Sequence, residues 1–497
     1  MHFFTLDTIM KLSIYRIFAL LIWLFSPLIG DSQSKLQSKM EKHFSQSSYK
    51  HAALSICVMD METNKVIAAI NPETSLVPAS SLKLITTLSS LDILGSDYQY
   101  ETKISYSGRL DPDGTLTGNV YIVGSGDPTL GSSRVALSGA VLPFKKLIVN
   151  IGQAIRDHGI TCIDGDVIAD ESIFDSYPIS PSWQWNDLGN YYASGAWGIN
   201  ANENEYYIYF KRNYGVGRMT KLHSYEPYIP KLVLENEVTI DSSNTPDNAY
   251  VFGGPYDFKK RIVGTVPYGQ GTFRIKGSIP DPPTFFAYHV YDQLRKYQIS
   301  SRGYKAKFKP KKVKMKEIKT YKSPNLAKIA KVTNFHSVNI YAESLMKTIG
   351  AEKNNRGSGG AGLYIVQKNM RNNGLKLTPL HMEDGSGLSA RNVISSKFMC
   401  QFLDKMYDKI DHDLLLSTLP HPGSISTVRG VNTGGRARSN IWVKSGSMER
   451  IQSFSGYIKS KSGKWLSFSI MANGLHVKNK KIRPLMGQMM RTIYEQG

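Results

Sequence analysis

Residues 78–94 have the sequence PASSLKLITTLSSLDIL, which combines a helical apolar pattern with a serine and a lysine three positions apart. Its apolar side chains recur at the spacing of one helical face: Leu84, Ile85, Leu88 and Leu91. Gly95 supplies a stop, so the stretch predicts a buried helix that begins near Ser80. Residues three apart share a helical face, so a neutral amine on Lys83 can take the proton of the Ser80 hydroxyl. S-x-x-K alone occurs by chance in many chains, so the pair needs companions before it indicates an activity.

Two further polar elements follow along the chain. Ser337-Val338-Asn339 stands between two predicted helices, and Lys444-Ser445-Gly446 ends an apolar strand with the sequence IWV. The serine of the second element can relay a proton to a leaving amine while its asparagine holds a substrate amide. The lysine and serine of the third can bind a substrate carboxylate, and its glycine lets the substrate lie against the strand. The order S-x-x-K, S-x-N, K-[ST]-G is typical of penicillin-binding proteins and active-site serine β-lactamases.

More of the chain supports a family resemblance. The motifs are Pro78-Ala79-Ser80, Gly126-Asp127-Pro128-Thr129-Leu130, Asp384-Gly385-Ser386-Gly387-Leu388-Ser389, and Val443-Lys444-Ser445-Gly446-Ser447 followed by Ser455-Gly456-Tyr457. With them the chain resembles the class C low-molecular-mass penicillin-binding proteins, the D-alanyl-D-alanine carboxypeptidase/endopeptidase family (peptidase family S13), from about residue 50 to 490. The resemblance implies an α+β fold with a β-lactamase/transpeptidase-like catalytic domain, an antiparallel sheet flanked by helices. It also implies a large inserted domain region between the S-x-x-K and S-x-N elements.

The resemblance also implies catalytic roles. Ser80 would be the acylated nucleophile and Lys83 its general base, with Ser337 as proton shuttle and Asn339 positioning the substrate. Lys444 would bind the terminal D-Ala carboxylate. The backbone N–H groups of Ser80 and Ser447 would form the oxyanion hole. No metal and no cofactor is expected.

A second set of residues is expected to bind the substrate. Its members are Ser445, Gly446 and Ser447 on the strand, Asp384 and Ser386 in the site wall, Arg391, and Asp170 and Phe174 reaching over the cleft from the insertion. The family carries an arginine directly after DGSGLS, whereas Ala390 stands there in this chain and Arg391 follows. If this arginine helps to hold the anionic groups of a substrate, its changed register should alter the substrate preference of the protein. Ser445 replaces the threonine that is common in the third element and keeps the hydroxyl.

The predicted organisation has four parts. Residues 1–30 form a signal peptide or N-terminal anchor, because Lys11 and Arg16 precede an apolar run at 17–29. Residues 31–105 and 316–497 form the catalytic domain, with a hairpin at 51–70, three strands within 441–471 and a terminal helix at 482–494. Residues 106–165 and 271–315 form an inserted α/β domain in which a helix-then-strand pattern occurs twice. Residues 166–270 form a nested β-rich sub-domain.

Composition limits the function classes. The chain has 497 residues, a formal net charge of +21 and three widely spaced cysteines (Cys57, Cys162 and Cys400), which are expected to be buried free thiols. Between Arg302 and Lys331 there are twelve basic residues and one acid, so this stretch holds +11 of the +21. Lys305, Lys307 and Lys309 alternate, which predicts one face of a strand. That face is either simply solvated or contacts an anionic cell wall or membrane surface, whereas nucleic acid does not suit an exported protein.

The expected function is therefore an exported, cofactor-free, serine-type D-alanyl-D-alanine carboxypeptidase/endopeptidase in the periplasm or another extracytoplasmic space. It would act on peptidoglycan stem peptides through a Ser80 acyl-enzyme and be inhibited covalently by β-lactams. Two alternatives remain open: a β-lactamase or esterase on the same scaffold, and a non-catalytic cell-wall-binding protein. The sequence leaves the oligomeric state and the balance of carboxypeptidase and endopeptidase activity undecided.

Overall fold

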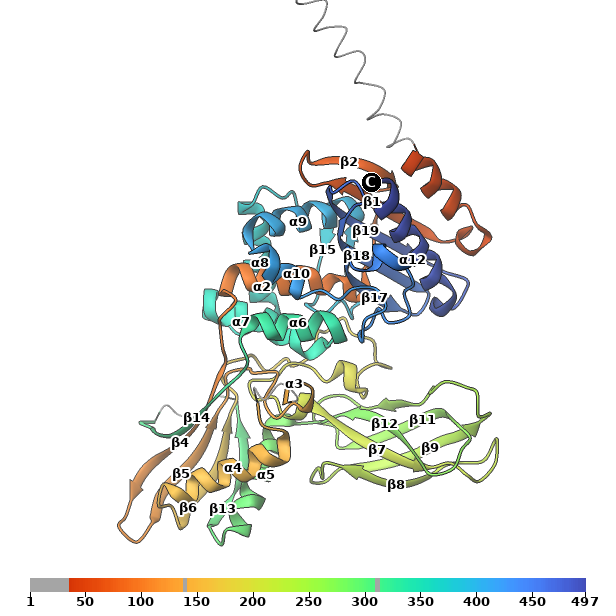
Figure 1. Cartoon of the computed structure of the whole chain (residues 1–497). Helices are drawn as coiled ribbons and strands as arrows, with labels where there is room; N and C mark the ends of the chain where they lie inside the picture. The colour runs from red at the N-terminus through yellow and green to blue at the C-terminus, as the bar shows by residue number, and fades with distance from the viewer. Residues whose placement is uncertain (1–34, 137–140, 309–312) are drawn as a thin grey trace, which may run out of the picture. The chain divides into compact units, whose positions relative to one another are not determined.

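The structure is a computed structural model that describes residues 35–136, 141–308 and 313–497 (Figure 1). The chain divides into two compact units. Unit 1 comprises Met1–Val77, Ile394–Lys405 and Pro420–Gly497, and unit 2 comprises Pro78–Val393 and Met406–Leu419. The predicted signal segment, residues 1–30, lies outside the described residues. In the described ranges, no helix combines the length and the apolar composition needed to cross a bilayer.

Unit 1 is built on a five-stranded antiparallel sheet with the order β17-β18-β19-β1-β2. The predicted hairpin and the three predicted C-terminal strands are confirmed as members of this sheet. Its strands are β1 (Ala53–Asp60), β2 (Lys65–Ile70), β17 (Ile441–Met448), β18 (Ile451–Lys459) and β19 (Trp465–Asn473). The other elements of this unit are η1 (Ser47–Tyr49), β3 (Ser75–Leu76), β16 (Val393–Ser395), α9 (Ser396–Lys409), α11 (Gly435–Arg438) and α12 (Asn479–Gln496). Residues of α9 from Met406 on are counted to unit 2.

The pleat of β1 sends alternate side chains to two different helices. Ile56 and Val58 pack into the core that the C-terminal helix α12 closes (Figure 1). On the other face, Cys57 clusters with Cys400 of α9, whose Sγ lies 3.4 Å from the Cys57 carbonyl oxygen. The sheet is therefore flanked by helices, as predicted. Both thiols are free and buried, which confirms that prediction for them, whereas Cys162 in unit 2 is partly exposed.

The helical part of unit 2 holds the predicted serine and lysine. The 3-10 turn η2 (Ala79–Leu82) leads directly into α2 (Lys83–Leu94), which ends at Gly95 with φ of 88°. Every residue from Lys83 to Leu91 is buried, which confirms the predicted core helix. The remaining elements of this part are α6 (Leu326–His336), α7 (Asn339–Asn354), α8 (Gly359–Asn372), β15 (Leu380–His381) and α10 (His412–Ser417).

Unit 2 also contains a five-stranded mixed sheet with the order β13-β6-β5-β4-β14, whose core includes side chains of α4 and α5. Its strands are β4 (Glu101–Leu110), β5 (Thr115–Val123), β6 (Cys162–Asp170), β13 (Ser300–Lys307) and β14 (Lys316–Lys322). The helices of this part of the chain are α3 (Ser133–Ala136), α4 (Phe144–Asp157) and α5 (Pro282–Lys296). The two predicted helix-then-strand copies are present as α4-β6 and α5-β13. Their strands pair in parallel, with Ser300 opposite Cys162.

The segment between these copies is rich in strands, as the sequence predicts. Two three-stranded sheets have the orders β10-β11-β9 and β12-β7-β8. The elements are η3 (Tyr191–Ala193), η4 (Asn202–Asn204), β7 (Glu205–Lys211), β8 (Lys221–Glu226), β9 (Val233–Asp241), β10 (Tyr250–Phe252), β11 (Lys259–Pro267) and β12 (Thr272–Ser278). The four-part domain division stays a prediction, although β4 and β14 place residues 101–105 and 316–322 in the mixed sheet, beyond the expected limits of the insertion.

Carboxylates on neighbouring strands offset part of the basic stretch. Lys305 and Lys307 are exposed along β13, as the alternation predicts. Arg302 pairs with Asp164 at 2.6 Å, Lys305 pairs with Asp166, and Lys322 pairs with Glu101 at 3.0 Å. Lys309 lies outside the described residues.

Candidate functional site

The site in unit 2 begins at a strained turn. Ala79 is fully buried and has φ of 48°, a conformation that is uncommon for a residue with a Cβ atom. Backbone strain of this kind concentrates at functional sites, because the surrounding structure must hold it. The turn places the partly buried Ser80 one helical turn ahead of Lys83, at the point where α2 begins. Ser80 and Lys83 therefore share one face, as the S-x-x-K spacing predicts.

Lys83 is completely buried and makes three polar contacts. Its Nζ lies 3.0 Å from Ser80 Oγ, 2.6 Å from Asn339 Oδ1 and 2.6 Å from the Ser386 carbonyl oxygen. Burial lowers the pKa of Lys83 from 10.5 to about 7, against the opposing charges of Asp384 and Glu343. A lysine with a pKa near neutrality has a substantial neutral fraction at pH 7, which a general base requires.

The second element lies at the junction of two helices. α6 ends at His336, Ser337 is its left-handed C-cap with φ of 56°, and α7 begins at Asn339. The Asn339 side chain is fixed at both ends, because its Oδ1 accepts from Lys83 while its Nδ2 donates to the Tyr192 carbonyl oxygen at 2.7 Å. Ser80, Lys83 and Asn339 thus form one contiguous cluster, although 256 positions separate Lys83 from Asn339.

The Asp384–Ser389 loop provides the Ser386 carbonyl that binds Lys83. Asp384 organises this loop from inside, since its carboxylate accepts the backbone N–H groups of Gly387 at 2.8 Å and Ser389 at 2.7 Å. Asn392 donates to the same carboxylate at 2.9 Å. Gly387 has φ of 78°, and a Cβ atom there would lie 2.0 Å from the Ala79 carbonyl oxygen, so only glycine fits. The loop therefore lies directly against the turn that carries Ser80. The role of Asp384 and Ser386 toward a substrate stays a prediction.

Sequence reasoning missed two charged residues beside this cluster. Glu343 is buried on α7 and accepts the backbone N–H groups of Ser386 at 2.7 Å and Gly385 at 3.1 Å. Burial, reinforced by the charge of Asp384, raises the pKa of Glu343. Lys347 follows one helical turn later and is also buried. The spacing Asn339, Glu343, Lys347 places all three on one face of α7, and this polar stripe was visible in the sequence.

Three predicted substrate-binding residues lie elsewhere in unit 2. Asp170 is buried at the end of β6, where it accepts the backbone N–H of Ser172 at 3.1 Å. Phe174 is buried with its ring 5.5 Å from Lys347 Nζ. Arg391 is exposed beyond the Asp384–Ser389 loop. Their roles toward a substrate stay predictions.

The third element belongs to unit 1. Lys444, Ser445, Gly446 and Ser447 lie on β17, the edge strand of the five-stranded sheet. Lys444 is fully buried and its Nζ donates to the Ser445 carbonyl at 2.6 Å, while Ser445 Oγ donates to Thr427 Oγ1 at 2.9 Å. Ser447 is exposed near the end of the strand. The strand predicted from IWV is present, but it does not end at this element: β17 continues through Lys444-Ser445-Gly446 to Met448, because these residues still pair with β18.

The cluster in unit 2 is equipped for acyl transfer. A hydroxyl lies within hydrogen-bond reach of an amine of lowered pKa, and an asparagine amide beside them is held in one orientation. In the described part of the chain, no group of three or more His, Cys, Asp or Glu side chains is arranged to hold a metal ion.

Comparison with known proteins agrees with this chemistry. The model of the D-Ala-D-Ala carboxypeptidase 3 (S13) family matches residues 36–495. The D-alanyl-D-alanine carboxypeptidase DacB of Haemophilus influenzae is 24% identical over 445 residues, covering 88% of this chain and 89% of that protein.

Two solved structures are similar to the chain. The crystal structure of penicillin-binding protein 4 from Haemophilus influenzae has a TM-score of 0.78 at 23% identity, covering 91% of this chain and 98% of the other. The same protein in complex with a β-lactam has a TM-score of 0.73 at 20% identity, covering 93% and 99%. These likenesses confirm the α+β fold with a transpeptidase-like domain and a further inserted region. The family model spans nearly the whole chain, so the chain belongs to the D-Ala-D-Ala carboxypeptidase 3 (S13) family.

Proposed function

We propose that this chain is an exported serine-type D-alanyl-D-alanine carboxypeptidase/endopeptidase that acts on peptidoglycan stem peptides in the periplasm or another extracytoplasmic space. One observation carries the proposal: the fully buried Lys83 amine, with its pKa near 7, lies 3.0 Å from the Ser80 hydroxyl. Family membership and the name of the Haemophilus relative support the substrate class. The β-lactam complex of the similar structure supports inhibition by β-lactams.

In the proposed reaction, neutral Lys83 takes the proton of Ser80 as the serine oxygen attacks the carbonyl carbon of the D-Ala-D-Ala bond. Asn339 holds the substrate amide, and the backbone N–H groups of Ser80 and Ser447 stabilise the oxyanion. The C–N bond breaks, and Ser337 delivers a proton to the departing D-Ala amine. Lys444, with Ser445 and Gly446 beside it on β17, binds the terminal carboxylate. Water then hydrolyses the acyl-enzyme and restores the serine.

Covalent labelling tests this proposal. Purified protein incubated with fluorescent penicillin is expected to carry the label on Ser80, and Ser80→Ala is expected to abolish it. Ser81→Ala is the matched control, because the neighbouring hydroxyl donates to the Pro78 carbonyl at 2.8 Å and has no proposed role in acylation. Wild-type protein that takes no label, or equal labelling of Ser80→Ala, contradicts the proposal.

Product analysis separates the proposed peptidase from its alternatives. Incubation with purified peptidoglycan is expected to release D-Ala or split cross-links, which mass spectrometry identifies. A β-lactamase would instead turn penicillin over rapidly, and a hydrolysis time course distinguishes turnover from trapping. A non-catalytic wall-binding protein would give neither product, and Ser80→Ala would retain its full biological function.

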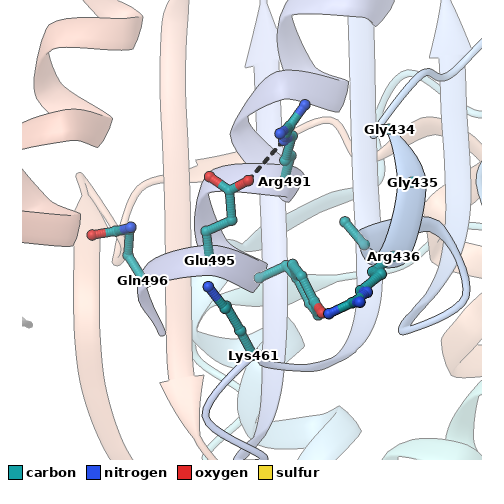
Figure 2. A pocket seen from close by; sticks show the side chains of 9 residues that line it. Gly434, Gly435, Arg436, Lys461, Arg491, Glu495 and Gln496 are labelled. Carbon is teal, nitrogen blue, oxygen red and sulfur yellow. Dashed lines mark hydrogen bonds and ion pairs between the residues drawn. The ribbon is translucent and has the colours of Figure 1, made fainter.

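We also propose that the protein associates peripherally with an anionic cell wall, through its basic surfaces. Part of the basic stretch is neutralised by ion pairs, but unit 1 has a further cationic pocket of about 360 Å³ (Figure 2). Its lining includes three cationic side chains, Arg436, Lys461 and Arg491, and one acidic side chain, Glu495. Glu495 pairs with Arg491 at 2.8 Å. The excess of positive charge in the pocket suits carboxylates of wall polymers.

Co-sedimentation with insoluble peptidoglycan tests this association. We expect binding to weaken as salt rises and to fall in the double variant Arg436→Gln, Lys461→Gln. The control is Lys145→Gln, Lys146→Gln, which removes the same charge from the exposed face of α4. Binding that is insensitive to salt and to the pocket variant contradicts the proposal.

A further inference from the structure

A segment of the insertion is fastened to the helix that carries Asn339. Lys347 of α7 is only 5% exposed, and its Nζ reaches three partners in this segment. It lies 2.8 Å from Asp175 Oδ1, 2.7 Å from the Tyr177 carbonyl oxygen and 3.1 Å from the Ala196 carbonyl oxygen. Because these partners lie at both ends of residues 175–196, Lys347 closes this stretch into a loop, named here the clasp segment.

The clasp segment is bonded both to the proposed catalytic cluster, at Asn339, and to the Asp384–Ser389 loop beside it. The Tyr192 carbonyl accepts from Asn339 Nδ2 at 2.7 Å. Trp183, 7% exposed, donates its indole N–H to Asp384 Oδ2 at 2.8 Å. The second contact is the more informative, because it ends on a buried carboxylate that controls a loop of the site.

Asp384 connects Trp183 to Lys83 through the hydrogen bonds of the Asp384–Ser389 loop. Its carboxylate accepts the backbone N–H of Gly387, the residue directly after Ser386, and that of Ser389 at the end of the loop. The Ser386 carbonyl in turn accepts from Lys83 Nζ at 2.6 Å. A side chain of the insertion is therefore linked to the proposed general base through one carboxylate and one loop.

We infer that Trp183 is a positioning residue for the reaction: its indole N–H holds the Asp384–Ser389 loop where the Ser386 carbonyl orients the Lys83 amine toward Ser80. This inference rests on the proposed function, because it assumes that Lys83 is the base for Ser80. It makes the clasp segment a working part of the acylation site as well as a connection to the inserted sheets.

The charges around Lys83 determine how loss of the indole N–H should change the pH at which Lys83 becomes neutral. Among the described residues of unit 2, the charged groups that act on Lys83 are Asp384 from the loop and Glu343 from α7. The remaining neighbours Ser80, Asn339 and the Ser386 carbonyl are uncharged. Without the indole N–H, the negative charge of Asp384 is less compensated and attracts the Lys83 proton more strongly. Lys83 then needs a higher pH to become neutral, and the loop that orients it is less firmly held.

The test compares Trp183→Phe with Trp197→Phe in the full chain. Trp197 is a matched control, because it is also buried in the insertion but donates its indole N–H to the Ser194 carbonyl, at 3.1 Å, and not to the loop. The readout is the second-order rate constant of acylation by fluorescent penicillin across pH 5–9, with thermal unfolding measured in parallel.

We expect Trp183→Phe to slow acylation at pH 7 roughly tenfold, since small displacements of catalytic groups have effects of this order or larger. The midpoint of its acid limb should move to higher pH, and Trp197→Phe should leave that midpoint in place. An unchanged or lowered midpoint in Trp183→Phe overturns the inference, as does an equal shift in both variants. If Trp183→Phe does not fold, Trp183→Met takes its place in the same comparison.

The wild-type measurement distinguishes a failure of the proposed function from a failure of the role of Trp183. Wild-type protein that is not acylated at Ser80 contradicts the proposed function and this inference with it. Normal wild-type acylation together with an unaltered Trp183→Phe profile contradicts the role of Trp183 alone.

Discussion

Replacing Lys83 by methionine should change how protein stability depends on pH. Lys83→Met keeps an unbranched side chain in the buried site but removes the titratable amine and its three polar contacts. In the wild type, burial lowers the pKa of Lys83 from 10.5 to about 7 in the folded chain. Between these pH values the unfolded chain keeps a proton that the folded chain has released. Raising the pH in this window therefore favours folding of the wild type, and the variant lacks this contribution.

The size of the effect follows from the shift in pKa. One unit of pKa corresponds to about 1.4 kcal/mol. Integrated over the partial titration near pH 7, the Lys83 contribution raises the wild-type free energy of unfolding by roughly 2 kcal/mol between about pH 7 and pH 9. Lost hydrogen bonds shift the variant by a nearly constant amount, so they do not imitate this slope. The difference in stability, variant minus wild type, should thus fall by roughly 2 kcal/mol across this interval.

Urea unfolding at pH 7, 8 and 9 measures the pH dependence of stability, and covalent penicillin labelling in parallel measures the effect on acylation. Lys461→Met, at an exposed lysine, controls for the loss of a lysine as such. The general-base role also predicts that acylation by Lys83→Met falls by about 10²–10⁴-fold. A stability difference that stays constant from pH 7 to pH 9 would refute the reasoning, because Lys83 would then remain charged in the folded protein throughout that range.

Three further substitutions have defined outcomes. Burial raises the pKa of Asp127 from 3.8 to about 6, so wild-type stability should fall as pH rises through this window. Asp127→Asn removes this carboxyl and should therefore lack the decrease of roughly 2 kcal/mol in the free energy of unfolding that the wild type shows between pH 4 and pH 7 in urea unfolding, and an identical pH dependence would contradict this. Gly387→Ala places a Cβ atom 2.0 Å from the Ala79 carbonyl oxygen and should lower the melting temperature more than Gly374→Ala, which has a similar φ of 80° but nothing within 4 Å. Met489→Ala removes a fully buried side chain of α12 and should cost about 2–5 kcal/mol in denaturant unfolding; an unchanged midpoint would show that it is not core.

Much of the local structure was predictable from periodicity. The buried helix after Ser80, the three C-terminal strands and the terminal helix depend on sequence patterns that span only a few residues each, and all are present in the structure. The S-x-x-K spacing also predicted that Ser80 and Lys83 share a face, because an i, i+3 relation is a property of the helix itself.

The supporting contacts of the site were not predictable in this way. Trp183 and Asp384 are 201 positions apart, and nothing in the local pattern of either residue indicates the hydrogen bond between them. The sequence shows Glu343 only as a polar residue of a helix, and its hydrogen bond with the Ser386 backbone depends on how the two segments pack. Pairings of this kind depend on how distant segments pack, which local propensity does not encode.

The sequence by itself determined the order of the elements and the chemical identity of the reactive groups: a serine, a lysine and an asparagine at spacings that suit acyl transfer. Only the tertiary structure decided that Lys83 is wholly buried, with its amine held by Ser80, Asn339 and the Ser386 carbonyl. The physical reason is that the proton affinity of a lysine depends on desolvation and nearby charge, and the charges that act on Lys83 belong to α7 and the Asp384–Ser389 loop. Both lie more than 250 positions from Lys83 in the chain, so the state of its amine is a property of the fold.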